Sequence, residues 1–365
     1  MRHDASNRER LARRAGGLAL ASAALAAACA EPSSAPLAPA PAVAPALAPD
    51  PGRVLTVVHG ALGCLFELSI HDVAEADARR VAARATAEID RVEDLLGGWR
   101  DDTALALLNR EAAARSIAAP PLLYDSVVRA LELTRATEGA FDVTVGPLVD
   151  AYGFRLGTPR LPPPDELERL AGSVGSEHVL VDPAGRTLAF DRPGVVVDLD
   201  GFNKGVAVDR VIELLRAAGV ADASISAGGS TIGSIGPPPS RPPRTVAVAG
   251  PDGEVHARVP LRDAVLSTSG NWRRAIEMEG REVGPIFDPR SGEPVSSAVL
   301  SATAIAVRGD DSEAFAKAAI VLGVDGAQRL VEAHGGLGLV LLVRSADPDA
   351  EIEVLRLGSA VEGAR

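Results

Sequence analysis

The chain of 365 residues is 47% hydrophobic and 3% aromatic, and it carries a net charge of −12 at pH 7. It is long enough to bury the core of one large domain or of two smaller ones. The acidic balance, together with the lack of a basic stripe with interleaved aromatics, argues against nucleic-acid binding. The two cysteines, Cys29 and Cys64, are too few for a disulfide framework or a zinc site.

Residues 1–28 have the three parts of a secretory signal peptide. Arginines form a basic start, Gly17 to Ala28 is apolar, and small residues precede Cys29. The apolar stretch is too short to remain as a transmembrane helix. Leu25 to Cys29 resembles a bacterial lipobox, so we expect export, lipidation of Cys29 and a membrane-anchored lipoprotein that faces the periplasm. An ordinary cleaved signal with an incidental cysteine is the alternative.

Residues 29–52 are rich in alanine and proline. Such a segment is expected to form an extended polyproline-type tether, which spans about 3.1 Å per residue. A lipid anchor followed by this tether would hold a folded domain near the membrane. We therefore expect the globular domain to cover residues 53–358.

The hydrophobic pattern of the globular part predicts both strands and helices. Residues 54–58 and 65–70 have the pattern of a hairpin, and residues 74–96 carry the apolar stripe of a long amphipathic helix that ends at Gly97. Strands outnumber helices and several neighbours look antiparallel, which predicts an α+β fold. Further helices are expected at 121–137, 162–170, 313–322 and 326–334, and further strands at 179–181, 187–190, 245–249, 255–259, 265–267, 300–307 and 337–343.

The stretch 195–236 is the centre of the predicted fold. Val195 to Val197 predicts a short buried strand, the helical spacing after Gly205 predicts a helix, and Ala223 to Ala227 predicts a second strand. A helix start offers free N–H groups and the positive end of the helix dipole, and Lys204 lies beside it. This combination suits a phosphate or pyrophosphate. Ordinary α/β structure with a surface lysine is the alternative.

Six motifs follow one another in an order that is typical of one family. They are Trp99 with the short helix to Asn109, TEGAFDVTVGPLVDAYGF (137–154), VDLDGFNKGVAVDR (197–210), SISAGGSTIGSIG (224–236), LSTSG (266–270) and IFDPRSGEPV (286–295). Together they resemble the ApbE family, flavin transferases that move FMN from FAD to a threonine of a target protein. The resemblance implies a single ApbE-like (T-fold-like) domain of mixed, mostly antiparallel sheets with packed helices.

The same resemblance implies a site. FAD would lie in a cleft with Mg²⁺ on its pyrophosphate, and a threonine hydroxyl of a partner would attack the FMN phosphorus. Charge accumulates on the bridging oxygen as AMP leaves, so cations and N–H donors are needed there. Lys204 and Asp198 are implied in catalysis. The residues implied to contact FAD are Leu62, Trp99, Ala140, Phe141, Asp142, Asp198, Lys204 and Ile286, and those implied at the metal are Gly201, Asn203, Glu313 and Lys317.

Simpler roles remain open for some of these residues. Asp142 could cap the segment that follows it, and Trp99 could be a buried plug after a helix. Asp142 and Asp198 could either contact polar groups of ribose or adenine, or orient Lys204.

The sequence also departs from the family pattern. Ser230 stands in place of an aspartate, Pro285 in place of a histidine, Leu62–Cys64 in place of Met-Gly-Thr, and Glu313 and Lys317 in place of the Asp and Thr of a metal-binding helix. Their spacing predicts that Glu313 and Lys317 form a pair on one helix face.

Two hypotheses follow, because an ammonium group repels Mg²⁺. The first is an active transferase with an altered metal site. Its partner would be a flavin-accepting protein with an exposed threonine motif, expected to be a subunit of a membrane redox complex. The second is a membrane-tethered FAD-binding carrier or scaffold that has lost the transfer chemistry.

Overall fold

The computed structural model describes residues 47–155, 159–272, 275–278, 281–345, 352–361 and 364. The expected signal peptide (1–28), the expected lipidation residue Cys29 and the tether up to residue 46 lie outside the described residues. Where the chain is described, no helix combines the length and the apolar character that crossing a membrane requires.

The first strand, β1 (Pro49–Ala61), includes the last residues assigned to the tether. Acidic side chains hold this segment in place: the Gly52 amide donates to Asp72 over 2.7 Å and the Ala48 amide donates to Asp77 over 2.8 Å. The expected domain start at residue 53 therefore falls inside β1.

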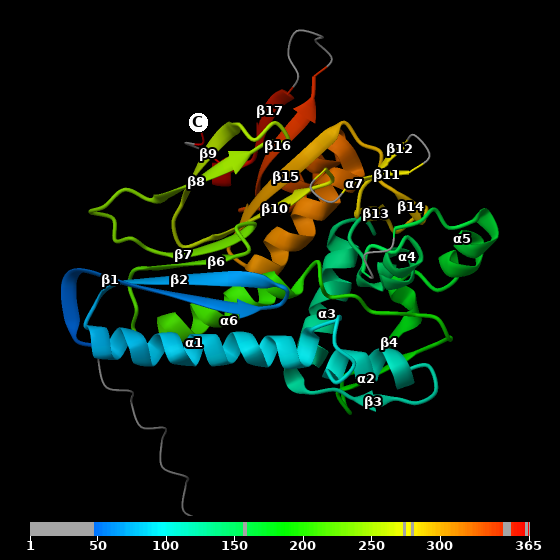
Figure 1. Cartoon of the computed structure of the whole chain (residues 1–365), viewed down its shortest axis with the longest axis horizontal. Helices are drawn as coiled ribbons and strands as arrows, with labels where there is room; N and C mark the ends of the chain where they lie inside the picture. Colours follow the sequence, from blue (N-terminus) through cyan, green and yellow to red (C-terminus); the bar gives the residue numbers. More distant parts are fainter. Residues whose placement is uncertain are drawn as a thin grey trace, which may run out of the picture. The chain divides into compact units, whose positions relative to one another are not determined.

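Eight of the described strands form one sheet at the centre of the fold (Figure 1). In spatial order they are β1, β2 (Cys64–Val73), β6 (Ala223–Ala227), β7 (Thr231–Ile235), β10 (Val265–Gly270), β15 (Val299–Ala306), β16 (Gly338–Arg344) and β17 (Ile352–Leu357). Every neighbouring pair is antiparallel, which confirms the α+β prediction.

Three long helices pack against the sheet (Figure 1). They are α1 (Glu75–Leu96), α6 (Asn203–Ala217) and α7 (Gly309–Ala333). Their apolar stripes supply the main core, in which Val81, Val208, Ile320 and Leu341 are almost completely buried. Burial of such side chains is the main stabilising contribution, about 1.5–3 kcal/mol for each one.

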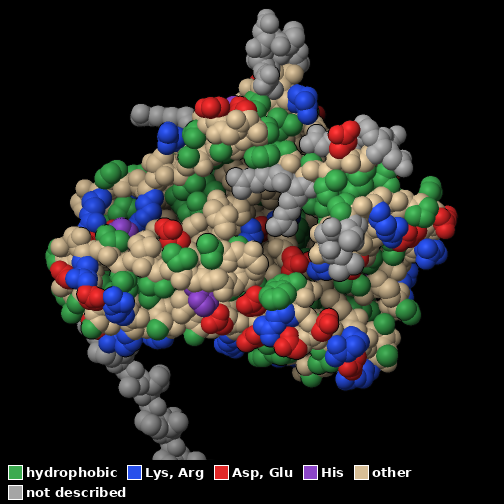
Figure 2. Space-filling view, in the orientation of Figure 1, with side chains coloured by type: hydrophobic (Ala, Val, Ile, Leu, Met, Phe, Trp, Pro, Cys, Tyr) green, Lys and Arg blue, Asp and Glu red, His purple; other side chains and the backbone are tan. Residues whose placement is uncertain are grey.

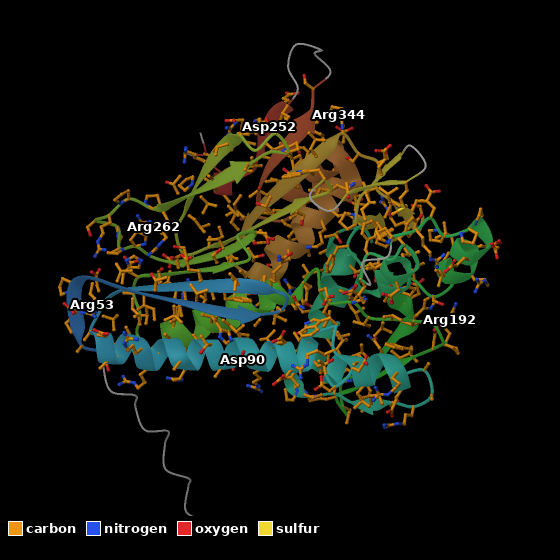
Figure 3. All side chains as sticks on the ribbon, viewed as in Figure 1. Arg53, Asp90, Arg192, Asp252, Arg262 and Arg344 are labelled. Carbon is orange, nitrogen blue, oxygen red and sulfur yellow. The ribbon has the colours of Figure 1, made fainter. Side chains whose placement is uncertain are left out.

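A hairpin of β8 (Arg244–Ala249) and β9 (Val255–Leu261) covers part of the opposite face of the sheet. Val259 of this hairpin packs with Ile305 and Leu342 in a second core. Charged side chains such as those of Arg192 and Arg344 lie at the outside of the fold (Figure 3).

A second group of elements flanks the sheet and forms one wall of the site. It contains helices, a three-stranded sheet and two short hairpins. These elements are α2 (Ala104–Glu111), β3 (Ile117–Ala118), α3 (Pro121–Ala136), η1 (Val143–Val145), α4 (Gly146–Ala151), α5 (Pro164–Ala171), η2 (Ser176–His178), β4 (Val179–Asp182), β5 (Thr187–Phe190), β11 (Ile276–Met278), β12 (Arg281–Val283), β13 (Phe287–Asp288) and β14 (Glu293–Pro294), while η3 (Ser359–Val361) follows β17.

Most expected elements are confirmed, but the predicted strand at Val195 to Val197 is wrong. Val195 and Val197 are buried, yet the segment pairs with no strand among the described residues. The side chain of Asn109 satisfies both the N–H and the C=O of Val197 at 2.9 Å, and the Asp198 amide donates to the Val143 carbonyl. The two helices expected at 313–322 and 326–334 are the halves of α7, which Gly323 breaks with a φ of 71°.

Candidate functional site

One pocket of about 640 Å³ gathers the residues that the sequence implied for FAD and for the metal. The surface is hollowed near the middle of the view in Figure 2, above the β1–β2 hairpin. The turn of this hairpin, the segment before α4, the start of α6 and the first half of α7 all reach the pocket. Its lining includes Leu62, Trp99, Ala140, Phe141, Asp142, Asp198, Gly201, Asn203, Lys204, Ile286, Glu313 and Lys317.

Lys204 lies in the first turn of α6 and reaches across to the loop between β6 and β7. Its Nζ donates to Ser230 Oγ over 2.6 Å and stands 3.7 Å from Glu313 Oε1. The side chain is 22% exposed and lines the pocket, so it is not the plain surface lysine of the alternative reading. Lys204 and Asn203, both in the first turn of α6, line the pocket, and the positive end of a helix dipole favours an anion.

Glu313 is the most deeply buried charge in the pocket, and each oxygen of its carboxylate accepts a hydrogen bond. Thr231 Oγ1 donates to Oε1 over 2.5 Å, and Lys317 Nζ donates to Oε2 over 2.6 Å. Burial alone would raise the pKa of Glu313, but the Lys317 and Lys204 ammonium groups and these hydrogen bonds lower it to about 2. Glu313 is therefore an anion at neutral pH. The predicted Glu313–Lys317 pair is confirmed.

The side chains present do not fit a Mg²⁺ site. Mg²⁺ requires oxygen ligands in near-octahedral geometry. Both oxygens of Glu313 already accept hydrogen bonds, one of them from an ammonium group. In the described part of the chain, no group of three or more His, Cys, Asp or Glu residues is placed to hold a metal ion. Gly201 and Asn203 line the pocket, but a Cβ atom on Gly201 would meet Lys317 Cε at 2.8 Å, so the lysine stem lies at this position.

An arginine organises the acidic residues at the mouth of the pocket. Arg155 donates to Asp198 Oδ2 over 2.7 Å and to Asp200 Oδ2 over 3.1 Å. Burial would lower the pKa of Arg155, but the carboxylates of Asp198, Asp150 and Asp200 raise it instead. Burial and the nearby Asp198 raise the pKa of Asp200 to about 6.

Two roles were open for Asp198, namely contact with ribose or adenine and orientation of Lys204. Within the described residues, the side chain of Asp198 bonds to Arg155 and to the Asp200 amide. Lys204 is oriented by Ser230 and Glu313. Among the described residues, Asp198 therefore does not orient Lys204, while its side chain lines the pocket.

Trp99 stands at the same mouth with 59% of its surface exposed, so it is not a buried plug. The backbone just before it is fixed, because the Gly98 amide donates to Asp200 Oδ1 over 3.3 Å. A Cβ atom on Gly98 would meet this oxygen at 3.0 Å, which favours glycine there. An exposed indole ring held at the edge of a pocket is well placed to stack on a planar ligand.

The turn at Ala140 to Asp142 forms another part of the wall. Asp142 does cap the next segment: its Oδ1 accepts from the Thr144 amide (2.8 Å) and its Oδ2 from the Ser176 amide (2.9 Å). Burial raises the pKa of Asp142. Phe141 packs against Phe202 with 6.0 Å between the ring centroids, which ties the turn to the start of α6. Asp142 therefore caps the next segment and also lines the pocket.

The apolar part of the wall comes from Leu62 and Ile286. Leu62 occupies the hairpin turn with a φ of 51°, and its amide donates to Glu93 Oε1 over 3.0 Å. Ile286 accepts a backbone hydrogen bond from Val295 over 2.9 Å. Cys64 is only half-buried and also lines the pocket, and burial raises the pKa of its thiol.

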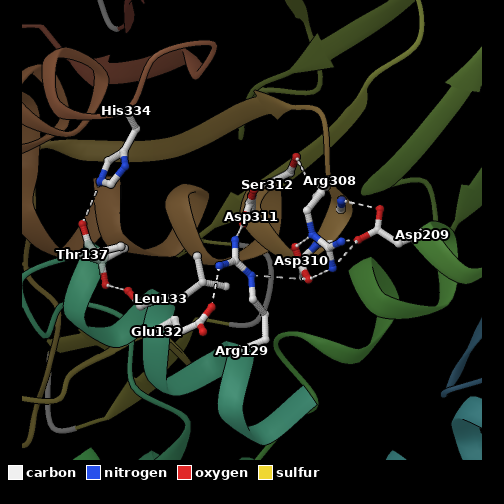
Figure 4. A network of polar contacts seen from close by, with 12 residues as sticks. Arg129, Glu132, Leu133, Thr137, Asp209, Arg308, Asp310, Asp311, Ser312 and His334 are labelled. Atoms are coloured by element: carbon white, nitrogen blue, oxygen red, sulfur yellow. Dashed lines mark hydrogen bonds and ion pairs between the residues drawn. The ribbon is translucent and has the colours of Figure 1, made fainter. Parts of the chain in front are cut away.

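A polar network fixes the start of α7, which carries Glu313 and Lys317. Asp209 of α6 accepts hydrogen bonds from the amides of Gly309 (2.6 Å) and Asp310 (3.2 Å). Figure 4 shows Arg129 of α3 reaching Asp310 and Asp311. Burial and the nearby Asp310 raise the pKa of Asp209 to about 7. The network ties three helices together behind the pocket.

Sequence reasoning missed three residues of this site: Arg155, Asp200 and Thr231. Asp200 and Thr231 lie inside quoted motifs (197–210 and 224–236), and Arg155 directly follows the motif that ends at Phe154. Proximity to a motif is therefore the signal that could have found them. Their partners lie far away in the sequence, so the pairing itself could not be read from it.

The chain is similar to known proteins of one family over most of its length. The ApbE family pattern matches residues 62–341, which contain every residue that lines the pocket. A FAD:protein FMN transferase from Klebsiella pneumoniae (strain 342) is 30% identical over 305 residues, covering 81% of this chain and 87% of that protein. Another from Salmonella typhimurium (strain LT2) is 30% identical over 298 residues, 78% of this chain and 83% of that protein.

Solved structures show the same likeness. A mutant form of the flavin transferase ApbE from Vibrio cholerae superposes with a TM-score of 0.76 at 25% identity, covering 85% of this chain and 99% of that one. The apo flavinyl transferase ApbE from Pseudomonas stutzeri superposes with a TM-score of 0.75 at 23% identity, covering 85% of this chain and 96% of that one. This second likeness concerns the fold alone.

Proposed function

The chain belongs to the ApbE family, and from this premise we propose that it transfers FMN from FAD to a threonine hydroxyl of a target protein. The observation that carries the proposal is the convergence of Lys204, Lys317 and the start of α6 in one pocket. A diphosphate in transfer needs positive charge and N–H donors that are already in place, and this wall supplies both.

The proposed reaction exchanges one P–O bond for another. The threonine oxygen attacks the phosphorus on the flavin side of the FAD diphosphate, and a new P–O bond joins FMN to the acceptor. The bond from that phosphorus to the bridging oxygen breaks, and AMP leaves with the bridging oxygen and its electron pair. The hydroxyl proton passes to water at the mouth of the pocket.

Roles follow from the positions of the side chains. Lys204 would donate to the diphosphate and stabilise the charge that grows on the leaving AMP. Asp198, paired with Arg155, would accept hydrogen bonds from sugar hydroxyl groups. Trp99 would stack on a ring of FAD, and the turn at Ala140 to Asp142 would contact the adenosine. Leu62 and Ile286 would supply apolar contacts to the ring system.

The acceptor and the location complete the proposal. We propose that the chain is exported, lipidated on Cys29 and held at the periplasmic face of a membrane. The signal-like segment 1–28 and the Ala/Pro-rich tether support this location. The acceptor would then be an exposed threonine on a subunit of a membrane redox complex. Replacing Cys29→Ser should move the protein from the membrane fraction to the soluble fraction, and an unchanged distribution would contradict lipid anchoring.

Transfer can be tested with the unlipidated Cys29→Ser chain. It is mixed with FAD and a threonine-containing acceptor domain, and the acceptor is followed by intact mass spectrometry. We expect FMN addition with release of one AMP for each adduct. An acceptor whose threonine is replaced by valine should stay unmodified. FAD binding without addition to several acceptors would favour the carrier or scaffold instead.

A further inference from the structure

We propose that Lys204 and Lys317 together replace the divalent cation, so that this chain binds the FAD diphosphate without Mg²⁺. The inference rests on the proposed function, because it assumes that FAD is the ligand of the pocket. It assigns to Lys317 a direct role in binding phosphate oxygens.

The two ammonium groups share one buried anchor. Glu313 Oε2 lies 2.6 Å from Lys317 Nζ, and Glu313 Oε1 lies 3.7 Å from Lys204 Nζ. Each lysine side chain is 22% exposed, while that of Glu313 is 3% exposed. One carboxylate thus holds two cations at the same wall of the pocket and leaves the cluster with a net positive charge. A diphosphate is the complementary ligand.

Both ammonium groups keep donor capacity for a ligand. An ammonium group has three N–H donors. Lys317 donates to Glu313 Oε2 and, over 3.3 Å, to the Glu313 carbonyl. Lys204 donates to Ser230 Oγ. Each can therefore still donate to a phosphate oxygen without giving up its partner.

The turn before α6 is shaped around the lysine stem. A Cβ atom on Gly201 would come within 2.8 Å of Lys317 Cε. The Lys317 stem therefore lies directly against the Gly201 backbone, in the part of the pocket that the sequence implied for the metal. A divalent ion brought to the same place would face the repulsion of two ammonium groups in a partly buried setting.

The first measurement is an FAD titration of the unlipidated Cys29→Ser chain, once with excess EDTA and once with Mg²⁺. We expect the two dissociation constants to agree within about two-fold, because the two ammonium groups would take the place of Mg²⁺. For scale, a ten-fold difference would correspond to about 1.4 kcal/mol of binding free energy. This comparison needs no change in the pocket, so it does not depend on a variant that folds poorly.

The second measurement uses Lys317→Thr in the same chain. We expect FAD binding in EDTA to weaken by about ten-fold or more, because a charge-assisted hydrogen bond is lost. Mg²⁺ should recover part of this loss. Arg329→Thr is the matched control: it removes a positive charge from the same helix at a side chain that is 54% exposed, and its FAD affinity should not change.

The outcomes separate this inference from the proposed function. FAD binding by the starting chain that requires Mg²⁺ would overturn the inference and leave the transferase function standing. Unchanged FAD affinity in a folded Lys317→Thr variant would overturn it as well. If FAD does not bind under either condition, both the proposed function and the inference fail.

Discussion

Gly205 of α6 and Gly309 of α7 lie in backbone contact. A Cβ atom on Gly205 would come within 2.4 Å of the Gly309 carbonyl oxygen, and one on Gly309 would come within 2.7 Å of the Gly205 carbonyl oxygen. Lys204 directly precedes the first glycine, and Glu313 lies one helical turn after the second. The close approach therefore sets the spacing between the charged groups of the pocket, and only glycine permits it.

The first prediction concerns this contact. Gly205→Ala forces the two helices apart, so we expect the free energy of unfolding to fall by roughly 1–3 kcal/mol, as in other overpacked cores. FAD binding should weaken too, because Lys204 moves away from Glu313. Urea unfolding and FAD titration measure the two effects. Gly335→Ala is the control, since a Cβ atom there meets nothing within 4 Å. Wild-type stability and affinity in Gly205→Ala would show that the contact does not set the spacing.

A second prediction follows from Asp209, whose pKa is raised from 3.8 to about 7 by burial and the nearby Asp310. A raised carboxyl pKa means that the folded state holds the proton more tightly than the unfolded state. The contribution of Asp209 to stability is therefore complete below about pH 4 and is lost as the pH rises to about 7, by roughly 4 kcal/mol at most.

Asp209→Asn keeps an oxygen for the Gly309 amide and cannot ionise. The difference in free energy of unfolding between the variant and the wild type should therefore shift in favour of the variant from pH 5 to pH 8. Urea unfolding at both pH values measures this difference. Asp125→Asn serves as the control, because its side chain is 64% exposed. Equal pH dependence of wild type and Asp209→Asn would show that Asp209 does not titrate in this range.

Local pattern and motif order predicted different parts of this molecule. Hydrophobic periodicity located α1 and α6, because an amphipathic stripe is written in consecutive residues. It failed at Val195 to Val197, where Asn109 takes the place of a partner strand. The missing information is tertiary, since a β-branched run looks the same whether a strand or a side chain satisfies its backbone.

In the functional site, too, some features could be predicted from the sequence and others depend on tertiary contacts. The family resemblance assigned residues from Leu62 to Lys317 to one pocket, and all of them line one pocket of the structure. The pairing of Arg155 with Asp198 and of Thr231 with Glu313 could not be predicted, because nothing local records which distant side chain will meet another. Only the Glu313–Lys317 pair, four residues apart on one helix, was readable from the sequence.

The third prediction concerns Trp99 at the pocket mouth. Because its side chain is 59% exposed, Trp99→Ala should change the free energy of unfolding by no more than about 0.5 kcal/mol. FAD affinity should fall by about ten-fold through the loss of ring stacking. Val307→Ala, at a side chain that is 73% exposed, is the control for removing a surface hydrophobic group. Unchanged FAD affinity in Trp99→Ala would place the rings of FAD elsewhere in the pocket.

The last prediction separates chemistry from folding at Lys204. Lys204→Met keeps the length of the stem and removes the ammonium group, so Ser230 and Glu313 each lose a partner at the pocket wall. The loss of one preorganised donor to a transferring group costs about 100-fold or more in rate. We therefore expect FMN attachment to the acceptor, followed by intact mass, to slow by at least about this factor. Arg210→Met removes a positive charge from the same helix, where Arg210 pairs with Glu88 at 2.9 Å, and should transfer FMN at the wild-type rate. Transfer by Lys204→Met as fast as by Arg210→Met would mean that the growing charge is stabilised from another wall of the pocket.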